Sequence, residues 1–242
     1  MSAAKYLKEA VALLQRLDPA PLQPAAQLLA DTIVAGGSLF SFGASHSFII
    51  TEELVYRAGG LMLVNPIYPH GMNLSVRPLP LTSKLERLPG LGTELLANSP
   101  AKRGDALLIT SQSGRNTVTI DMALLARERG IKTIVITALS NVGKLTSRHP
   151  SGKSLAELCD IVLDNHVPYG DAAVAIDNFP QKVAPLSTIA GCAIANALVA
   201  EVVALLVARG VPPPVFMSAN LDGGEAYNAR LLEQNRARIH YL

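Results

Sequence analysis

The sequence predicts an α/β protein in which a doubly wound parallel sheet lies between layers of helices. Short stretches with continuous apolar runs, such as residues 106–110 and 132–137, alternate with helical patterns along the chain. This alternation is typical of βαβ units, and strands that are apolar throughout are expected to be buried on both faces. With 242 residues, of which 49% are hydrophobic, the chain can bury a full core as one domain.

The first half of the chain begins with two predicted helices, around residues 7–14 and 24–33, because apolar residues recur there at helical spacing. A short strand over 38–42 follows and ends in a turn at Gly43. The next helix is expected to run through Arg57 until two glycines break it, and a second strand is predicted over residues 61–64. The sheet therefore starts with two strands joined by one helix.

Residues 66–103 are rich in proline and show no long period. The segment is longer than a plain connection in a compact domain, so it is expected to be a functional flap or to contain a short helix near 94–97.

The second half of the chain continues the same alternation. A strand over 106–110 leads through a polar loop into a helix, and Gly130 lies just past its end, where glycine is favoured. Further strands are predicted over 132–137 and 161–164, separated by a helix near Leu155. Residues 187–209 form one long helix that is apolar nearly all round, which must be covered by the sheet or by another subunit. A final helix is predicted after residue 224.

Composition excludes several classes of function. The net charge is +2, there is no Trp, and no stripe of basic residues interleaved with aromatics is present, so no nucleic-acid partner is expected. The N-terminus does not have the apolar core of a signal peptide. The most apolar stretch, residues 189–207, is interrupted by Gly191, Asn196 and Glu201 and is interpreted as a buried helix, with no membrane partner.

The cysteines and histidines give no indication of a cofactor. The 2 cysteines lie in different elements without Cys-x-x-Cys spacing, which favours reduced thiols in a cytoplasmic protein. The 5 histidines are far apart, so no metal site is predicted. No Gly-x-Gly-x-x-Gly fingerprint follows the strands, which argues against NAD.

The strongest local signal is the loop at residues 110–117, Thr-Ser-Gln-Ser-Gly-Arg-Asn-Thr. It lies at the carboxyl end of a buried strand and opens a helix, a location where open α/β sheets bind ligands. Helix N-termini favour anions, the hydroxyls of Ser111, Ser113 and Thr117 can bond phosphate oxygens, and Gly114 permits close approach. A capped turn is the alternative reading, but three hydroxyls and a glycine exceed what capping needs.

The chain resembles the SIS (sugar isomerase) domain family of phosphosugar isomerases and sugar-phosphate-sensing regulators. Two motifs carry the resemblance: Ser-Gln-Ser-Gly before an amphipathic helix and Lys-Thr-Ile-Val-Ile-Thr, and upstream the run 35–43 with Ser45, Ser47 and Glu-Glu-Leu. It covers roughly residues 22–210, leaving a C-terminal tail and helix over 211–242, and the tail is similar to a subgroup without an assigned reaction. It implies a single SIS domain with a flavodoxin-like three-layer αβα fold, helical extensions at both ends and self-association.

The resemblance also implies which residues hold the ligand. It assigns the phosphate and sugar to the serine and threonine loops, that is to Ser45, Ser47, Ser111, Gln112, Ser113, Gly114, Asn116 and Thr117. The first loop departs from the family's Gly-x-Gly-x-Ser, since Ser45 stands at the second glycine. Asn116 stands where Thr or Ser is usual. Both changes keep polar groups at the ligand, so a sugar phosphate is the expected small-molecule partner.

Isomerisation between aldose and ketose needs a base next to the carbonyl and a proton shuttle. Glu53 matches the second Glu of the motif in members resembling heptose-phosphate isomerases. It could equally form a surface ion pair with Arg57, four residues on. Those isomerases use a His on the late helix, which here contains none. His46 is the substitute we favour, ahead of His70 and His166.

Three functions are therefore open from the sequence. The first is a phosphosugar isomerase with Glu53 as the base. The second is a binding module that senses a sugar phosphate without turning it over, and the third is a lyase acting on an ether-linked amino-sugar phosphate. In each case the apolar helix over 189–207 offers more surface than one sheet face covers, which predicts a homodimer or higher homo-oligomer.

Overall fold

Five parallel strands form the central sheet of the computed structural model, which describes all residues from 1 to 242. Their order is β2-β1-β3-β4-β5, so β2 is added on one side of β1 and all later strands on the other, and the strand order reverses between β1 and β3. The strands are β1 (Leu39–Gly43), β2 (Val64–Pro66), β3 (Ala106–Thr110), β4 (Lys132–Thr137) and β5 (Ile161–Asp164). Such a reversal opens a crevice outside the carboxyl ends of the two strands, where ligands bind in doubly wound folds.

The register of β1 and β3 places two loops side by side. The strands pair along their whole length, from Leu39 with Ala106 to Gly43 with Thr110. Both strands therefore end at the same level. The loop after Gly43 and the loop after Thr110, which carry the two motifs, emerge next to each other.

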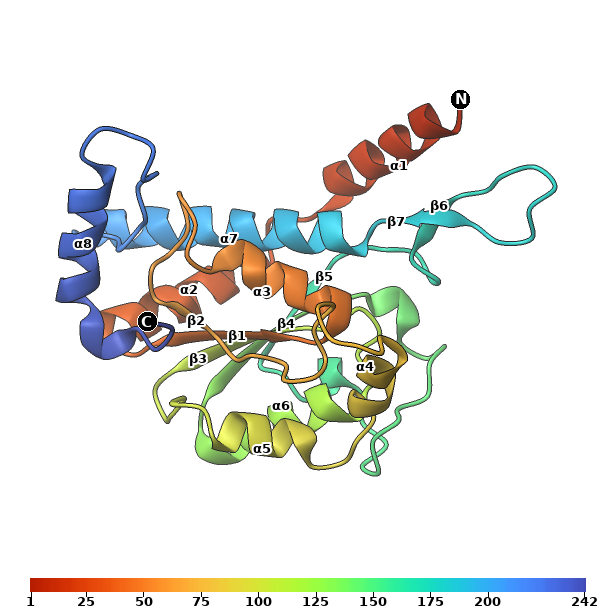
Figure 1. Cartoon of the computed structure of the whole chain (residues 1–242), viewed down its shortest axis with the longest axis horizontal. Coiled ribbons are helices and arrows are strands. Elements are labelled where there is room, and N and C mark those ends of the chain that lie inside the picture. Colours follow the sequence, from red (N-terminus) through yellow and green to blue (C-terminus); the bar gives the residue numbers. More distant parts are fainter.

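Helices cover both faces of the sheet in three layers, as the sequence predicts. One face carries α2 (Leu22–Val34), α3 (Phe48–Leu54) and α7 (Ser187–Ala208), and the other α5 (Leu91–Ala97) and α6 (Thr117–Arg129) (Figure 1). The buried apolar side chains form a large cluster on each side, of 25 and 18 residues, as expected for a parallel sheet covered by helices on both faces.

Helix α7 is long and apolar enough to cross a membrane by length and composition alone. However, 44% of its most apolar 18-residue window is buried inside the fold, where it lies against α2 and α3. Its outer side remains exposed at Ile189, Ala197, Ala204 and Val207. The helix is therefore a core element with one uncovered face.

Two elements project from the body of the molecule. Helix α1 (Ser2–Arg16) and an antiparallel hairpin of β6 (Ala172–Val174) and β7 (Val183–Pro185) extend in the same direction (Figure 1). The hydroxyl of Tyr6 donates a hydrogen bond to the carbonyl of Pro185 at 3.1 Å, which joins the two. The sequence did not predict the hairpin.

The C-terminal residues cover the β2 edge of the sheet. After α8 (Gly224–Gln234) the chain returns to Asn65 in β2, whose Oδ1 accepts the backbone N–H of His240 at 2.7 Å. Its Nδ2 donates to the carbonyl of Arg238 at 3.0 Å. The Tyr241 hydroxyl donates to the carbonyl of Met62 at 2.8 Å. These bonds fasten the last turn of the chain to the open edge.

Several predicted boundaries were wrong. Helix α3 ends at Leu54, not near Arg57, because Val55 is extended and Tyr56 has a positive φ of 51°. Strand β2 begins three residues late, and Leu61 instead pairs with Val215. Residues 155–157 form only one 3-10 turn. The proline-rich segment contains two short helices, α4 (Pro80–Leu85) and α5.

Candidate functional site

Two polar hollows meet at the carboxyl end of β3 and together form one cleft. They share four lining residues, His46, Ser47, Thr110 and Gln112, and have volumes of about 310 Å³ and about 200 Å³. The larger hollow is called here the α7 half, and the smaller one the α6 half. The sheet reversal between β1 and β3 positions both, because the first motif supplies one wall and the second motif the other.

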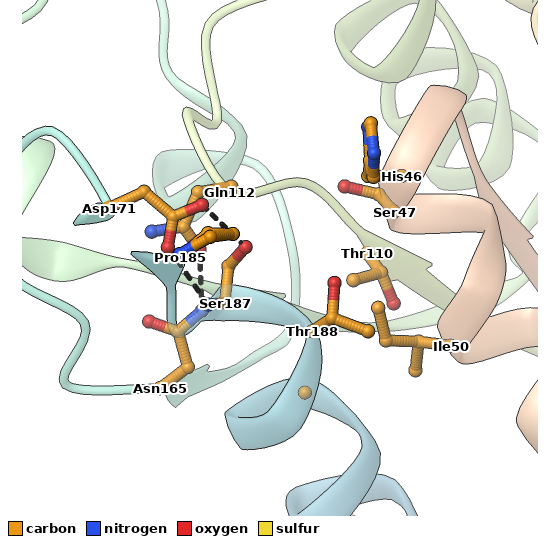
Figure 2. A pocket seen from close by; sticks show the side chains of 11 residues that line it. His46, Ser47, Ile50, Thr110, Gln112, Asn165, Asp171, Pro185, Ser187 and Thr188 are labelled. Atoms are coloured by element: carbon orange, nitrogen blue, oxygen red, sulfur yellow. Dashed lines mark hydrogen bonds between the residues drawn. The ribbon is translucent and has the colours of Figure 1, made fainter. Parts of the chain in front are cut away.

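The α7 half lies between the start of α3 and the start of α7 (Figure 2). Most of its 11 lining residues are polar and few of them are charged, and Ile50 is the one large apolar residue among them. The lining consists of His46, Ser47, Ile50, Thr110, Gln112, Asn165, Asp171, Pro185, Ser187, Thr188 and Gly191. Neutral hydroxyl and amide groups of this kind are suited to the hydroxyls of a sugar.

Asp171 does not offer a free carboxylate to this half. Its Oδ1 accepts the backbone N–H groups of Leu186 and Ser187 at 3.1 and 2.8 Å, and its Oδ2 accepts the Ser187 hydroxyl at 2.7 Å. These bonds satisfy the orphan donors at the start of α7. Asp171 therefore fixes the first turn of α7 and aims Ser187 and Thr188 at the cleft.

The α6 half lies over the loop that opens α6. Its wall is formed by Ala44, Ser45, His46, Ser47, Glu86, Thr110, Ser111, Gln112, Ser113, Asn116 and Thr119. The only carboxylate in this wall is Glu86, which directly follows α4. Its Oε1 accepts the Ser45 hydroxyl and its Oε2 accepts the side-chain amide of Asn116, both at 2.5 Å. A negative group thus bridges the two motif loops.

Positive charge surrounds that carboxylate. Arg148 donates to the Oδ1 of Asn116 at 2.7 Å. Burial lowers the pKa of Arg148, the neighbouring guanidinium groups of Arg115 and Arg87 lower it further, and Glu86 raises it. Mutual repulsion among three guanidinium groups is relieved by an anion placed between them. The α6 half therefore has the electrostatic character of an anion site.

Thr110 carries an unsatisfied hydroxyl at the junction of the two halves. Its side chain is buried, 5% exposed, and its Oγ1 has no hydrogen-bond partner in the protein. A buried polar atom without a partner costs about 1–3 kcal/mol. Because Thr110 lines both hollows, a ligand spanning the cleft can supply the missing partner.

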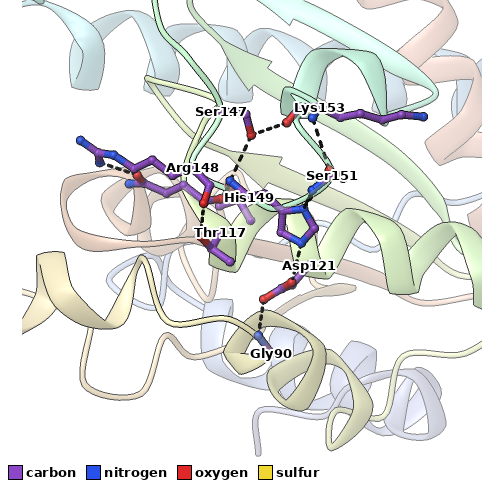
Figure 3. A network of polar contacts seen from close by, with 10 residues as sticks. Gly90, Thr117, Asp121, Ser147, Arg148, His149, Ser151 and Lys153 are labelled. Atoms are coloured by element: carbon purple, nitrogen blue, oxygen red, sulfur yellow. Dashed lines mark hydrogen bonds and ion pairs between the residues drawn. The ribbon is translucent and has the colours of Figure 1, made fainter.

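A polar network joins α6 to two neighbouring loops (Figure 3). Asp121 on α6 accepts the backbone N–H of Gly90 at 2.8 Å and pairs with the Nε2 of His149 at 3.0 Å. The Nδ1 of His149 accepts the N–H of Ser151, which indicates that the ring proton is on Nε2. Asp121 therefore joins α6 to the start of α5 and to the loop that carries Arg148.

Most of the candidate residues named from the sequence are brought together in this cleft. Ser45, His46, Ser47, Ser111, Gln112, Ser113 and Asn116 all line it. Gly114 and Thr117 do not. Gly114 faces a neighbouring hollow on the far side of the loop, and the Thr117 hydroxyl is turned away to the carbonyl of Arg148, at 3.2 Å. Thr119 lines the cleft instead.

Glu53 lies outside the residues that line the cleft. Its Oε1 accepts the side-chain amide of Asn196 on α7 at 2.7 Å and forms an ion pair with Arg57. Glu52 is exposed to solvent. The alternative reading of Glu53 as a partner of Arg57 thus describes its contact in this structure. The other two candidate histidines do not line the cleft either: His166 pairs with Asp164 at 3.1 Å, and His70 is exposed.

The sequence interpretation missed several lining residues. Asn165 follows β5 directly, and its position at a strand's carboxyl end could have indicated it. Ser187 and Thr188 open the long helix, a second signal of the same kind. Glu86 and Asp171 carry no signal in the sequence, because they reach the cleft only through tertiary folding. No group of three or more His, Cys, Asp or Glu side chains is arranged to hold a metal ion.

Comparison with known protein families shows which family the chain belongs to. Residues 5–138 match the model of the SIS domain family. The chain belongs to the SIS domain family. It is 50% identical to a UPF0309 protein of Shouchella clausii over 91% of this chain and 90% of that one. It is 46% identical to a UPF0309 protein of Oceanobacillus iheyensis over 97% and 95%.

Solved structures support the same SIS fold. The phosphoheptose isomerase of Neisseria gonorrhoeae superposes with a TM-score of 0.55 at 16% identity, covering 84% of this chain and 97% of that one. The phosphoheptose isomerase of Francisella tularensis gives 0.51 at 16% identity, over 81% and 91%. The parallel sheet flanked by helices is therefore shared with these proteins.

Proposed function

We propose that this SIS domain binds a sugar phosphate in the cleft and isomerises it between aldose and ketose. The phosphate lies in the α6 half, on Ser111, Ser113 and the start of α6, and the sugar extends into the α7 half. The buried, unpartnered hydroxyl of Thr110 carries the proposal, because it stands where the two halves join. The names of the superposed phosphoheptose isomerases support it.

The α6 half of the cleft suits the phosphate of such a ligand, and the α7 half suits its sugar. The α6 half combines free hydroxyls, a helix N-terminus and nearby guanidinium groups, all of which favour an anion. The α7 half offers neutral donors and acceptors at Ser47, Gln112 and Thr188, which match sugar hydroxyls. In this assignment Ser45 and Ser47 orient the sugar, and Gly114 and Thr117 shape the loop from behind.

The proton transfer is assigned to His46 and Glu53. His46 lines both halves and can reach a carbon near their junction. Glu53 lies further along the chain, near the end of α3, and it must leave Asn196 and Arg57 to approach the sugar. Catalytic contacts are often formed only with substrate bound. Binding without turnover is the second candidate, and the present engagement of Glu53 with Asn196 favours it.

A panel of sugar phosphates, screened first by thermal shift and then for products, tests the proposal. Ser111→Ala with Ser113→Ala is expected to weaken binding at least tenfold while the melting temperature of the free protein stays nearly constant. Equal affinity of the double variant and the unmodified protein contradicts the assignment of the phosphate. Binding with no product in any case identifies a sensing protein.

A further inference from the structure

Residues 73–90 form a surface segment, called here the lid, that is weakly attached to the body. Only Thr82 is buried in it, and four of its leucines are exposed, Leu74, Leu79, Leu81 and Leu88. Its main apolar anchor is Leu85, which lies against Gly71 and the second core cluster. Segments with few buried contacts open at low free-energy cost.

Glu86 makes every hydrogen bond that ties residues 73–89 to the protein beyond the adjoining start of α5. Its carbonyl accepts the backbone N–H of Val118 at 3.1 Å. Its carboxylate accepts the Ser45 hydroxyl and the Asn116 amide. All other hydrogen bonds of the segment stay within it or reach the first residue of α5. Glu86 is therefore the one residue that fastens the lid ahead of its end at Gly90, whose N–H is held by Asp121.

The atoms that hold Glu86 belong to the start of α6 and to the two motif loops, and Glu86 lines the same half of the cleft as Ser111 and Ser113, which the proposed function assigns to the phosphate. Val118 is in the first turn of α6, whose free N–H groups attract anions. Ser45 and Asn116 belong to the two motif loops, and Arg148 stands behind Asn116. The Glu86 carboxylate thus lies in the same half of the cleft as the proposed phosphate, and the two negative groups would repel each other there.

We propose that Glu86 is an internal anion that closes the empty cleft, and that a phosphorylated ligand displaces it and opens the lid. This inference rests on the proposed function. Exchange favours the ligand because a phosphomonoester carries about −1.5 to −2 charges and three acceptor oxygens, whereas Glu86 brings one charge. A ligand with a single carboxylate gains no such advantage, so Glu86 also selects phosphomonoesters over sugar acids.

Hydrogen exchange followed by mass spectrometry tests the tether without any ligand. Glu86→Gln is expected to accelerate exchange in residues 73–90 several-fold. The matched control is Glu94→Gln, which removes the same charge from the exposed face of α5, where the carboxylate contacts only Asn98. Addition of inorganic phosphate to the unmodified protein is expected to accelerate exchange in the same residues. Unchanged exchange in Glu86→Gln, or slower exchange with phosphate, overturns the inference.

Calorimetric titration with inorganic phosphate and with gluconate tests the competition. Glu86→Gln is expected to bind phosphate about tenfold more tightly than the unmodified protein and to gain affinity for gluconate, with Glu94→Gln unchanged. Equal phosphate affinity of Glu86→Gln and the unmodified protein, with loss of binding in the Ser111→Ala, Ser113→Ala variant, refutes the lid but leaves the proposed function standing. If phosphate and every sugar phosphate bind to neither protein, both proposals are wrong.

Discussion

Arg148 donates a hydrogen bond from its guanidinium group to the Oδ1 of Asn116 at 2.7 Å. The bond fixes which way the Asn116 amide points, because the acceptor end faces Arg148 and the donor end is left for Glu86. An asparagine at this position therefore serves the cleft as a donor, as the more usual Thr or Ser hydroxyl would. Arg148 also places a positive charge next to Asn116, which lines the anion site.

Arg148→Ala is expected to weaken binding of the preferred sugar phosphate at least tenfold, because the charge is lost and the Asn116 amide is free to rotate. Calorimetric titration measures the change. Arg127→Ala, which removes an exposed arginine near the other end of α6, is the control. Equal losses in the two variants would mean that net charge alone attracts the ligand.

Thr110→Val separates ligand binding from stability. Valine has nearly the same shape and lacks the unpartnered hydroxyl, so the free protein is expected to become more stable by about 1 kcal/mol. Sugar-phosphate affinity is expected to fall at the same time. Urea unfolding and calorimetry measure the two effects. A loss of stability without a loss of affinity would show that Thr110 has a structural partner instead.

Asp121→Asn tests the network that joins α6 to two neighbouring loops. Asparagine can still accept the Gly90 N–H, but the charged acceptor of the His149 ring is lost, and the free energy of unfolding is expected to fall by about 1–3 kcal/mol. Urea unfolding followed by circular dichroism gives the value. Asp222→Asn, an exposed position in the C-terminal tail, is the comparison and is expected to be neutral.

The two thiols predict a dependence on pH. Burial raises the pKa of Cys159 to about 12, and burial also raises that of Cys192. The thiolate is the reactive form, so native Cys159 is expected to resist iodoacetamide at pH 8 while the unfolded protein reacts fully. Between about pH 9 and 12 the unfolded thiol loses its proton and the folded one keeps it, so stability falls as pH rises. Mass spectrometry of alkylated peptides checks the first expectation.

The exposed side of α7 is apolar, and we therefore still predict that the protein self-associates. Light scattering at micromolar concentration is expected to give a particle of at least twice the chain's 25.6 kDa. A charge placed on that side, as in Ala200→Glu, is expected to shift the particle toward the monomer. A monomer mass for the unmodified protein would contradict the prediction.

Much of the fold follows from local pattern, while parts of the cleft do not. We predicted the strands at 106–110 and 132–137 because burial on both faces requires a run of apolar residues. We predicted the end of α6 because a glycine follows it. The early end of α3 was missed because Tyr56 adopts a positive φ that only its packing stabilises; its ring contacts those of Phe216 and Tyr241.

Some residues of the cleft were likewise predicted from the sequence, and others were not. Ser111 was predicted because it follows a buried strand and precedes a helix, whereas Ser45 and Asn116 were predicted from the resemblance to the SIS family. Glu86 and Asp171 come from segments without a regular period, and their partners lie 15 to 41 residues away in the chain. Thr117 has the right residue type, but the helix turns its hydroxyl toward Arg148. Residue type alone therefore does not decide which hydroxyl faces a ligand.

The final turn of the chain has a consequence for solubility. Asn65 is 1% exposed, and its amide bonds with residues 238 and 240, which lie along the β2 edge. A chain cut after residue 235 would present that edge with its bonding groups uncovered, and such edges recruit strands from other molecules. Residues 238–240 thus protect the edge of the sheet, and proteolytic removal of these residues is expected to promote aggregation.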